Sequence, residues 1–210
     1  MFVEGALPGE DVDFAVLKKK LSHEFGKATA ILSASSARVT PRCPHFGVCG
    51  GCATQHADSR TQMAAKQRWL EENLARIGKV SAESLLPVIY GPDWGYRNRA
   101  RLSVRRVAKK GGVLVGFREK RSTYVADMKE CPVLPTRVVE LLPALKALIE
   151  GLSINERVPQ VEVAVGDNAT ALVFRHLLPL TPADLKNLKN FGEANHVHVW
   201  LQPGGPESFP

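Results

Sequence analysis

The sequence predicts an α+β protein with three parts: a run of short strands, a cysteine-rich loop with a helix after it, and an α+β domain built on an antiparallel sheet. Three observations predict this class. Apolar and polar residues alternate in short runs bounded by turn residues, which is typical of strands. Other segments repeat apolar residues at helical spacing. Pairs of strand-like runs are joined by glycine-containing turns, which favours hairpins.

The first forty residues carry three short strand patterns. Residues 2–3 precede a turn cluster at 5–9, and apolar and polar residues then alternate through 12–17. Residues 28–33 provide a third strand. Three short strands make a poor barrel, so we expect further strands before Met1.

A helix follows the loop at residues 41–56, which is rich in cysteine, glycine and proline. Asp58 or Ser59 can cap its start, and Gly78 ends it. Its apolar residues fall on one face at three-, four- and seven-residue spacing. They are Met63, Leu70, Leu74 and Ile77.

From residue 87 onward strands and helices mix. Residues 99–105 alternate arginine with apolar residues, and Lys109 to Gly112 form a turn leading into a strand at 113–118. We expect a third strand at 123–128. An apolar helix follows from Val138 to Ile149, bent or interrupted at Pro143.

The last part predicts a second hairpin, a helix and a strand. The hairpin joins 160–165 to 169–174. Thr181 caps a helix whose first turn begins with Pro182. Residues 196–201 form the final strand, on which His196, His198 and Trp200 alternate along a partly exposed face.

Charge is concentrated in one segment. The chain has a formal net charge of +7, but residues 97–121 alone carry +9 and the rest sum to −2. Such a patch indicates a polyanionic partner, most simply nucleic acid. No apolar run approaches 18 residues, so we expect no membrane span. No secretion signal is visible at the N-terminus, so a cytoplasmic protein with reduced cysteines is expected.

The four cysteines form a three-plus-one arrangement. Cys43, Cys49 and Cys52 lie within ten residues, and Cys131 follows after 78 more. Four thiolates suit an iron–sulfur cluster or a tetrahedral zinc, and the spacing favours the cluster over zinc, with inert buried cysteines as the third reading. Pro132 after the last cysteine adds to the cluster reading. His45 and His56 flank the loop as weaker alternative ligands.

Strand alternation places four arginines on one face, opposite Ala100, Leu102 and Val104. These are Arg97, Arg99, Arg101 and Arg105. Planar guanidinium groups suit phosphates and bases, and Trp94 and Tyr96 offer stacking surfaces for unpaired bases. The alternatives are a solvated face, or an arginine near Cys131 that neutralises an anionic cluster. Phe46, Phe117 and Tyr124 are expected in the core.

Four motifs, in this order, give the chain a recognisable pattern: CPHFGVCGGCATQH, WGYRNRARLS, VGFREKRS and CPVL. The pattern resembles the iron–sulfur family of 23S rRNA uracil-C5 methyltransferases. The resemblance implies that Cys43, Cys49, Cys52 and Cys131 hold a [4Fe-4S] cluster. It also implies a partial TRAM domain at 1–40, an OB-like barrel that binds RNA, then the iron–sulfur loop and helix at 41–90. The central α+β domain would span 91–201, and 202–210 would be a linker.

The chain also departs from that family. It has no glycine-rich motif for S-adenosylmethionine and no fifth cysteine to attack uracil. We therefore expect the N-terminal part of the enzyme, with rRNA as partner, no protein partner, no catalytic or cofactor-binding residue of its own, and no activity alone. S-adenosylmethionine would be bound only by a missing C-terminal domain. The alternative is a freestanding RNA-binding module stapled by zinc or a cluster.

Overall fold

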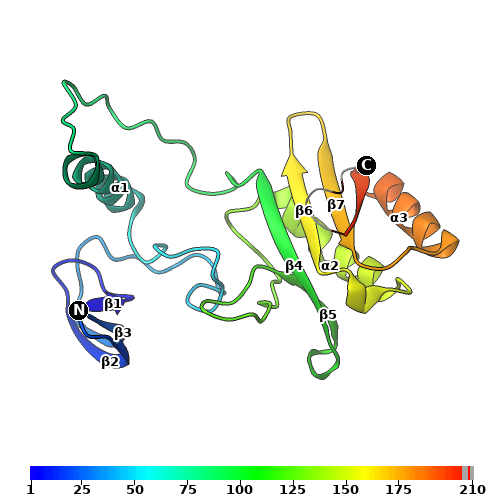
Figure 1. Cartoon of the computed structure of the whole chain (residues 1–210), viewed down its shortest axis with the longest axis horizontal. Helices are drawn as coiled ribbons and strands as arrows, with labels where there is room; N and C mark the ends of the chain where they lie inside the picture. Colours follow the sequence, from blue (N-terminus) through cyan, green and yellow to red (C-terminus); the bar gives the residue numbers. More distant parts are fainter. Residues whose placement is uncertain (205–207, 209–210) are drawn as a thin grey trace. The chain divides into compact units, whose positions relative to one another are not determined.

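The computed structural model describes residues 1–204 and 208, so most of the expected linker at 202–210 lies outside the described residues. The chain forms two compact units (Figure 1). The first comprises residues 1–42 and 54–90, and the second comprises 43–53 and the chain from Gly91 onward. The segment expected at 41–90 is thus divided between the units.

The first unit contains a three-stranded sheet in the order β1-β3-β2. Its strands are β1 (Phe2–Glu4), β2 (Asp11–Lys19) and β3 (Glu24–Ser33), with β2 antiparallel and β1 parallel to β3. Arg38 ties the turn after β1 to the segment after β3, because its guanidinium bonds the Glu10 carboxylate and the Gly5 carbonyl. The Arg38 hydrogen bond lowers the pKa of Glu10 to about 2.

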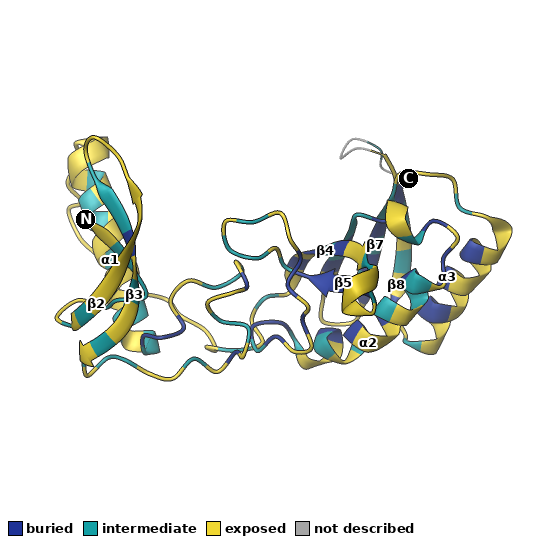
Figure 2. Cartoon of the chain, turned by 90° about the horizontal axis from the view of Figure 1, so that it is seen from below, coloured by how far each residue is buried: buried dark blue, intermediate teal, exposed yellow. Residues whose placement is uncertain are grey.

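Helix α1 (Ser59–Asn73) also belongs to the first unit, and one π-helical turn at Leu74–Gly78 extends it. Asp58 caps it by accepting a hydrogen bond from the Thr61 amide at 2.8 Å. No residue of α1 is buried, and Figure 2 shows this unit coloured mostly as exposed and intermediate. The apolar spacing seen in the sequence therefore does not mark a buried face among the described residues.

The second unit is an α+β fold around a five-stranded sheet in the order β5-β4-β6-β7-β8. The strands are β4 (Arg99–Val107), β5 (Gly112–Gly116), β6 (Gln160–Val165), β7 (Thr170–His176) and β8 (His198–Pro203). All neighbours are antiparallel except β7 and β8. The hairpins expected around 109–112 and 166–168 are both present.

Helices α2 (Thr136–Glu150) and α3 (Pro182–Ala194) supply the apolar residues that cover one face of this sheet. Leu102 and Val161 of the sheet and Ile149 of α2 are fully buried in this core. Most of the buried residues lie in this second unit (Figure 2). The structure describes no helix that is both long and apolar enough to cross a membrane.

Two expectations about elements are corrected. Helix α2 is not interrupted at Pro143, which lies on the exposed side, where water can satisfy the carbonyl that loses its amide partner; the alternative of a bend there stays a prediction. Residues 123–128 form no strand, and only an isolated bridge pairs Val125 with Arg118. Val125, Ala126 and Met128 are nevertheless buried, and Ala126 and Met128 belong to the core.

Asp184 at the start of α3 gives a direct test of this packing. Its buried carboxylate accepts hydrogen bonds from the amides of Ser153 and Thr181, both at 2.9 Å. Burial raises the pKa of Asp184, but the bonds from Ser153 and Thr181 outweigh it and lower the pKa to about 2. A lowered pKa stabilises the fold above the unfolded value of 3.8, and this contribution disappears as the pH falls towards 2.

We therefore expect Asp184→Asn to reduce the free energy of unfolding by about 1–3 kcal/mol at neutral pH, since buried donors lose their acceptor. Urea unfolding of both proteins measures this difference. The difference in unfolding free energy between wild type and variant should become smaller as the pH approaches 2. An equal difference at neutral pH and near pH 2 would contradict the role of the Asp184 charge.

Candidate functional site

All four cysteines lie in the second unit. They are free thiols, with Cys43, Cys49 and Cys131 buried and Cys52 half-buried. The segment 43–53, here called the cysteine loop, is shaped by tight backbone turns. The Phe46 amide donates to the Cys43 carbonyl at 3.0 Å, and the Cys49 amide donates to the His45 carbonyl at 2.9 Å.

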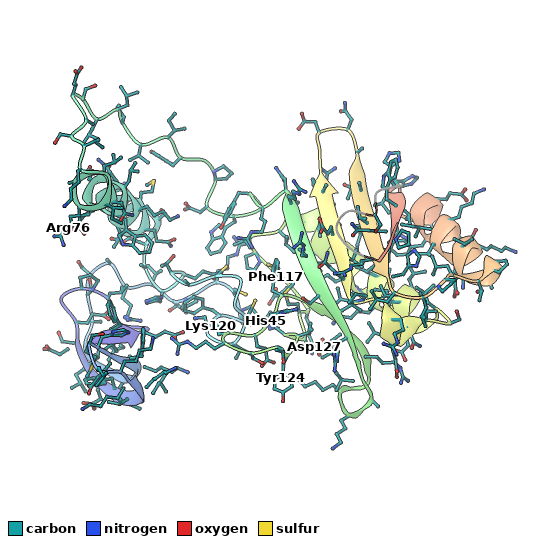
Figure 3. The ribbon with its side chains drawn as sticks, in the orientation of Figure 1. His45, Arg76, Phe117, Lys120, Tyr124 and Asp127 are labelled. Atoms are coloured by element: carbon teal, nitrogen blue, oxygen red, sulfur yellow. The ribbon has the colours of Figure 1, made fainter. Side chains whose placement is uncertain are left out.

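The cysteine loop pairs with residues 118–121, here called the basic turn. The Gly50 amide donates to the Arg118 carbonyl and the Lys120 amide donates to the Val48 carbonyl, both at 2.8 Å. Cys49 and Glu119 form an antiparallel bridge between these two bonds. The Lys120 ammonium lies 5.1 Å from the centre of the Phe46 ring. Figure 3 labels His45 on the loop and Lys120 on the turn.

Sequence reasoning missed this pairing. The charges of Arg118, Lys120 and Arg121 were visible as part of the basic segment. Nothing local in the sequence indicated that their backbone would pair with the cysteine loop. The strand predicted at 113–118 extended into this turn, whereas the observed strand ends earlier, at Gly112–Gly116.

The buried thiols share one electrostatic environment. Burial raises the pKa of Cys43, Cys49 and Cys131, and neighbouring cysteines raise each of the three further. Backbone amides act in the opposite direction. Hydrogen bonds from the amides of His45 and Phe46 lower the pKa of Cys43. The amide of Gly51 donates to the Cys49 sulfur at 3.4 Å. The amides of Val133 and Leu134 lower the pKa of Cys131 in the same way.

Burial and the charges of neighbouring cysteines disfavour free thiolates, whereas amide donors directed at sulfur favour them; iron ions bound by the thiolates would offset the two unfavourable effects. The four cysteines therefore suit a thiolate-ligated cluster. Among the described residues, no three or more His, Cys, Asp or Glu side chains are arranged to hold a single metal ion. The cluster consequently remains a prediction.

The two histidines offered as alternative ligands differ in position. The His45 ring accepts a hydrogen bond at Nε2 from the Lys129 amide, at 3.3 Å. His56 is buried in the first unit, whereas the cysteines belong to the second.

Strand β4 has the two faces that its alternation predicts. Ala100, Leu102 and Val104 are buried, while Arg99, Arg101 and Arg105 are exposed. Arg101 is not an unopposed charge, because Glu162 lies opposite it on β6 and pairs with it at 2.9 Å. Arg99 and Arg105 make no ion pair within the part of the chain that the structure describes.

The exposed face continues across the sheet to β8. Trp200 is 52% exposed and lies opposite Val173 of β7 in the parallel register. His198 lies on the same face and is exposed, as expected. His196 precedes the strand in a left-handed conformation, φ 53°, so the expectation that it alternates with them was wrong.

The aromatic expectations also divide. Phe117 packs against the core and Phe46 is half-buried. Tyr124 is 72% exposed, so its assignment to the core was wrong, and its side chain projects outward in Figure 3. Trp94 packs partly against the core, whereas Tyr96 is 50% exposed and keeps an accessible ring.

Arg97 is the arginine whose place differs most from expectation. It precedes β4 and is half-buried, and its amide donates to the Val133 carbonyl at 2.9 Å. Its guanidinium lies 5.5 Å from the centre of the Phe117 ring. Arg97 therefore contacts the segment that follows Cys131.

No family model matches the chain. The chain is 57% identical over 206 residues to the 23S rRNA (uracil(1939)-C(5))-methyltransferase RlmD of Aromatoleum aromaticum, covering 98% of the chain and 48% of that relative. It is 57% identical over 209 residues to the protein of the same name from Azoarcus sp., covering 100% of the chain and 48% of the relative. The chain thus spans about half the length of the curated relatives it matches.

The chain shares its fold with a solved structure, the Pyrococcus abyssi tRNA (uracil-54, C5)-methyltransferase in complex with S-adenosyl-L-homocysteine, with a TM-score of 0.63 and 21% identity. The match covers 99% of this chain and 48% of that one. At this identity, the similarity establishes the α+β architecture only.

Pairing of the cysteine loop with the basic turn leaves little room at Gly50. A Cβ atom there would lie 3.0 Å from the Arg118 carbonyl oxygen, a backbone atom that cannot move aside without breaking the pairing. We expect Gly50→Ala to cost about 1–3 kcal/mol of unfolding free energy. Gly91→Ala is the matched control, since its Cβ would meet nothing within 4 Å. Thermal unfolding of both variants measures the difference, and equal stability would argue against the pairing.

Proposed function

We propose that this chain is the RNA-recognising, [4Fe-4S]-binding part of an S-adenosylmethionine-dependent methyltransferase that forms 5-methyluridine in 23S rRNA. The observation that carries the proposal is 57% identity along almost the whole chain to proteins named for that reaction. The four cysteines in one unit and the basic surfaces beside them support the cluster and the RNA partner.

Methyl transfer itself is assigned to the part of the relatives that this chain does not match. Carbon 5 of uracil becomes nucleophilic once a thiolate adds at carbon 6. In our proposal all four cysteines of this chain are committed as ligands, so none is available for that addition. The residues described here would instead bind and orient the RNA.

Cys43, Cys49, Cys52 and Cys131 would hold the cluster, whose iron–thiolate bonds would cross-link the loop to a segment 78 residues further along the chain. The cysteine loop in turn holds the basic turn by two backbone hydrogen bonds. We infer a structural role for the cysteines: they fix the position of Arg118, Lys120 and Arg121 relative to β4.

The exposed face of the five-stranded sheet is the second proposed RNA surface. Arg99 and Arg105 would contact phosphates, and Tyr96 offers an accessible ring to an unpaired base. Arg101 would contribute less, because Glu162 already compensates its charge. Trp200 provides a further stacking surface on the same sheet.

The metal proposal is tested by composition. Protein purified without oxygen should contain about four irons and a matching amount of acid-labile sulfide per chain, as the named cluster requires. Cys131→Ser should lower both, since Cys131 is the ligand outside the cysteine loop. Ser59→Ala, in the other unit, is a control that should lower neither. Stoichiometric zinc without sulfide would contradict the proposal.

The RNA proposal is tested by salt dependence. Arg99→Gln and Arg105→Gln should each weaken binding to an rRNA fragment and flatten the plot of log affinity against log salt by about 0.7–0.9, the value for one lost phosphate contact. Arg101→Gln should flatten it less. Lys189→Gln on α3 is the control, because this exposed lysine pairs only with its own helix through Glu193. Unchanged slopes for Arg99 and Arg105 would favour a merely solvated face.

A further inference from the structure

The segment containing Arg97 runs beside the segment containing Cys131. The Gly95 amide donates to the Pro132 carbonyl and the Arg97 amide donates to the Val133 carbonyl, both at 2.9 Å. These bonds fix the backbone of Arg97 next to the residues whose amides serve the Cys131 thiol. The position of the Arg97 backbone is therefore set by hydrogen bonding to the segment after Cys131, and not by the pairing of β4.

The Arg97 side chain lies close to Phe117, a residue that also lies next to the cysteine loop. The guanidinium lies 5.5 Å from the ring centre, within the range of a cation–π contact. The same ring lies against Gly51, where a Cβ atom would be 3.1 Å from Phe117 Cδ2 and 3.4 Å from the Cys49 sulfur. Phe117 therefore lies next to both the Arg97 guanidinium and the Cys49–Cys52 turn.

Two further observations characterise the Arg97 charge. Arg97 is half-buried, and among the described residues it has no carboxylate within ion-pair distance. Arg97 is thus a half-buried cation that no carboxylate of the described residues compensates.

We propose that Arg97 is the counter-cation of the cysteine centre, stacked on Phe117 so that its charge stabilises the thiolates and the cluster they hold, and that it is not an RNA contact. This inference rests on the proposed cluster. A [4Fe-4S] centre with four thiolate ligands is anionic, and reduction makes it more so. A fixed cation beside it in a partly desolvated site favours the reduced form and keeps the thiolates bound.

The test compares two arginines that lie close together in sequence but differ in environment. Wild type, Arg97→Gln and Arg105→Gln are reconstituted with iron and sulfide. Each is then measured for the midpoint potential of the cluster, the half-time of its bleaching in air, and the salt dependence of RNA binding. Arg97→Lys keeps the charge without the planar stack, and Phe117→Leu keeps apolar packing without the cation–π contact.

Arg97→Gln should shift the potential to more negative values and shorten the bleaching half-time several-fold, while the salt slope stays at the wild-type value. Arg105→Gln should do the reverse, leaving the cluster unchanged and flattening the slope. Arg97→Lys should shift the midpoint potential less than Arg97→Gln does, because the lysine keeps the positive charge. Phe117→Leu should shift the potential in the same direction as Arg97→Gln. If Arg97→Gln does not fold, the potential of Phe117→Leu tests the inference instead, and an unchanged potential would contradict it.

Two results would overturn the inference, and they are distinguishable. If wild type forms a cluster but Arg97→Gln matches it in potential and bleaching, Arg97 is not the counter-cation, and a flattened slope would identify it as a phosphate contact. If wild type itself takes up no cluster from iron and sulfide, the proposed function fails and the inference fails with it.

Discussion

Two backbone hydrogen bonds between the cysteine loop and the basic turn are the constraint on which the proposed site depends. They join Gly50 to Arg118 and Lys120 to Val48, and they place the thiols and the positive charges on one small framework. Gly50 is required because a side chain would meet the Arg118 carbonyl. In our proposal, a cluster bound by Cys131 and the cysteine loop would restrict the motion of the loop and of the basic turn paired with it. The cluster would therefore stabilise one of the proposed RNA-binding surfaces.

The basic segment is not one uniform surface. Arg106 pairs with Glu150 and Glu156, and therefore braces β4 against α2 and the turn that follows it. Arg101 is compensated by Glu162, and Arg97 stacks on Phe117. Of the arginines on β4, Arg99 and Arg105 are the ones that our proposal assigns to phosphates. The net charge of a segment therefore overestimates the number of arginines available to contact RNA when some of them form ion pairs or pack against aromatic rings.

Much of the second unit could be predicted from sequence because its signals are local. Alternation defined both faces of β4, glycine-containing turns located two hairpins, and Thr181 with Pro182 marked the start of α3. The errors involve long-range contacts. Residues 123–128 alternate like a strand but find no partner strand, and Tyr124 is left exposed. Arg97 shares the parity of Arg99, yet hydrogen bonding to the Cys131 segment removes it from the strand. No local pattern records such bonds.

The central claim is that filling the cysteine centre fixes the basic turn. Hydrogen exchange of the Gly50 and Lys120 amides, measured by NMR in the presence and absence of iron and sulfide, tests it most directly, because these amides form the two bonds between loop and turn. The account predicts that both become markedly more protected when iron and sulfide are bound, while amides of α3 remain unchanged. Equal exchange of Gly50 and Lys120 in the two states would contradict it.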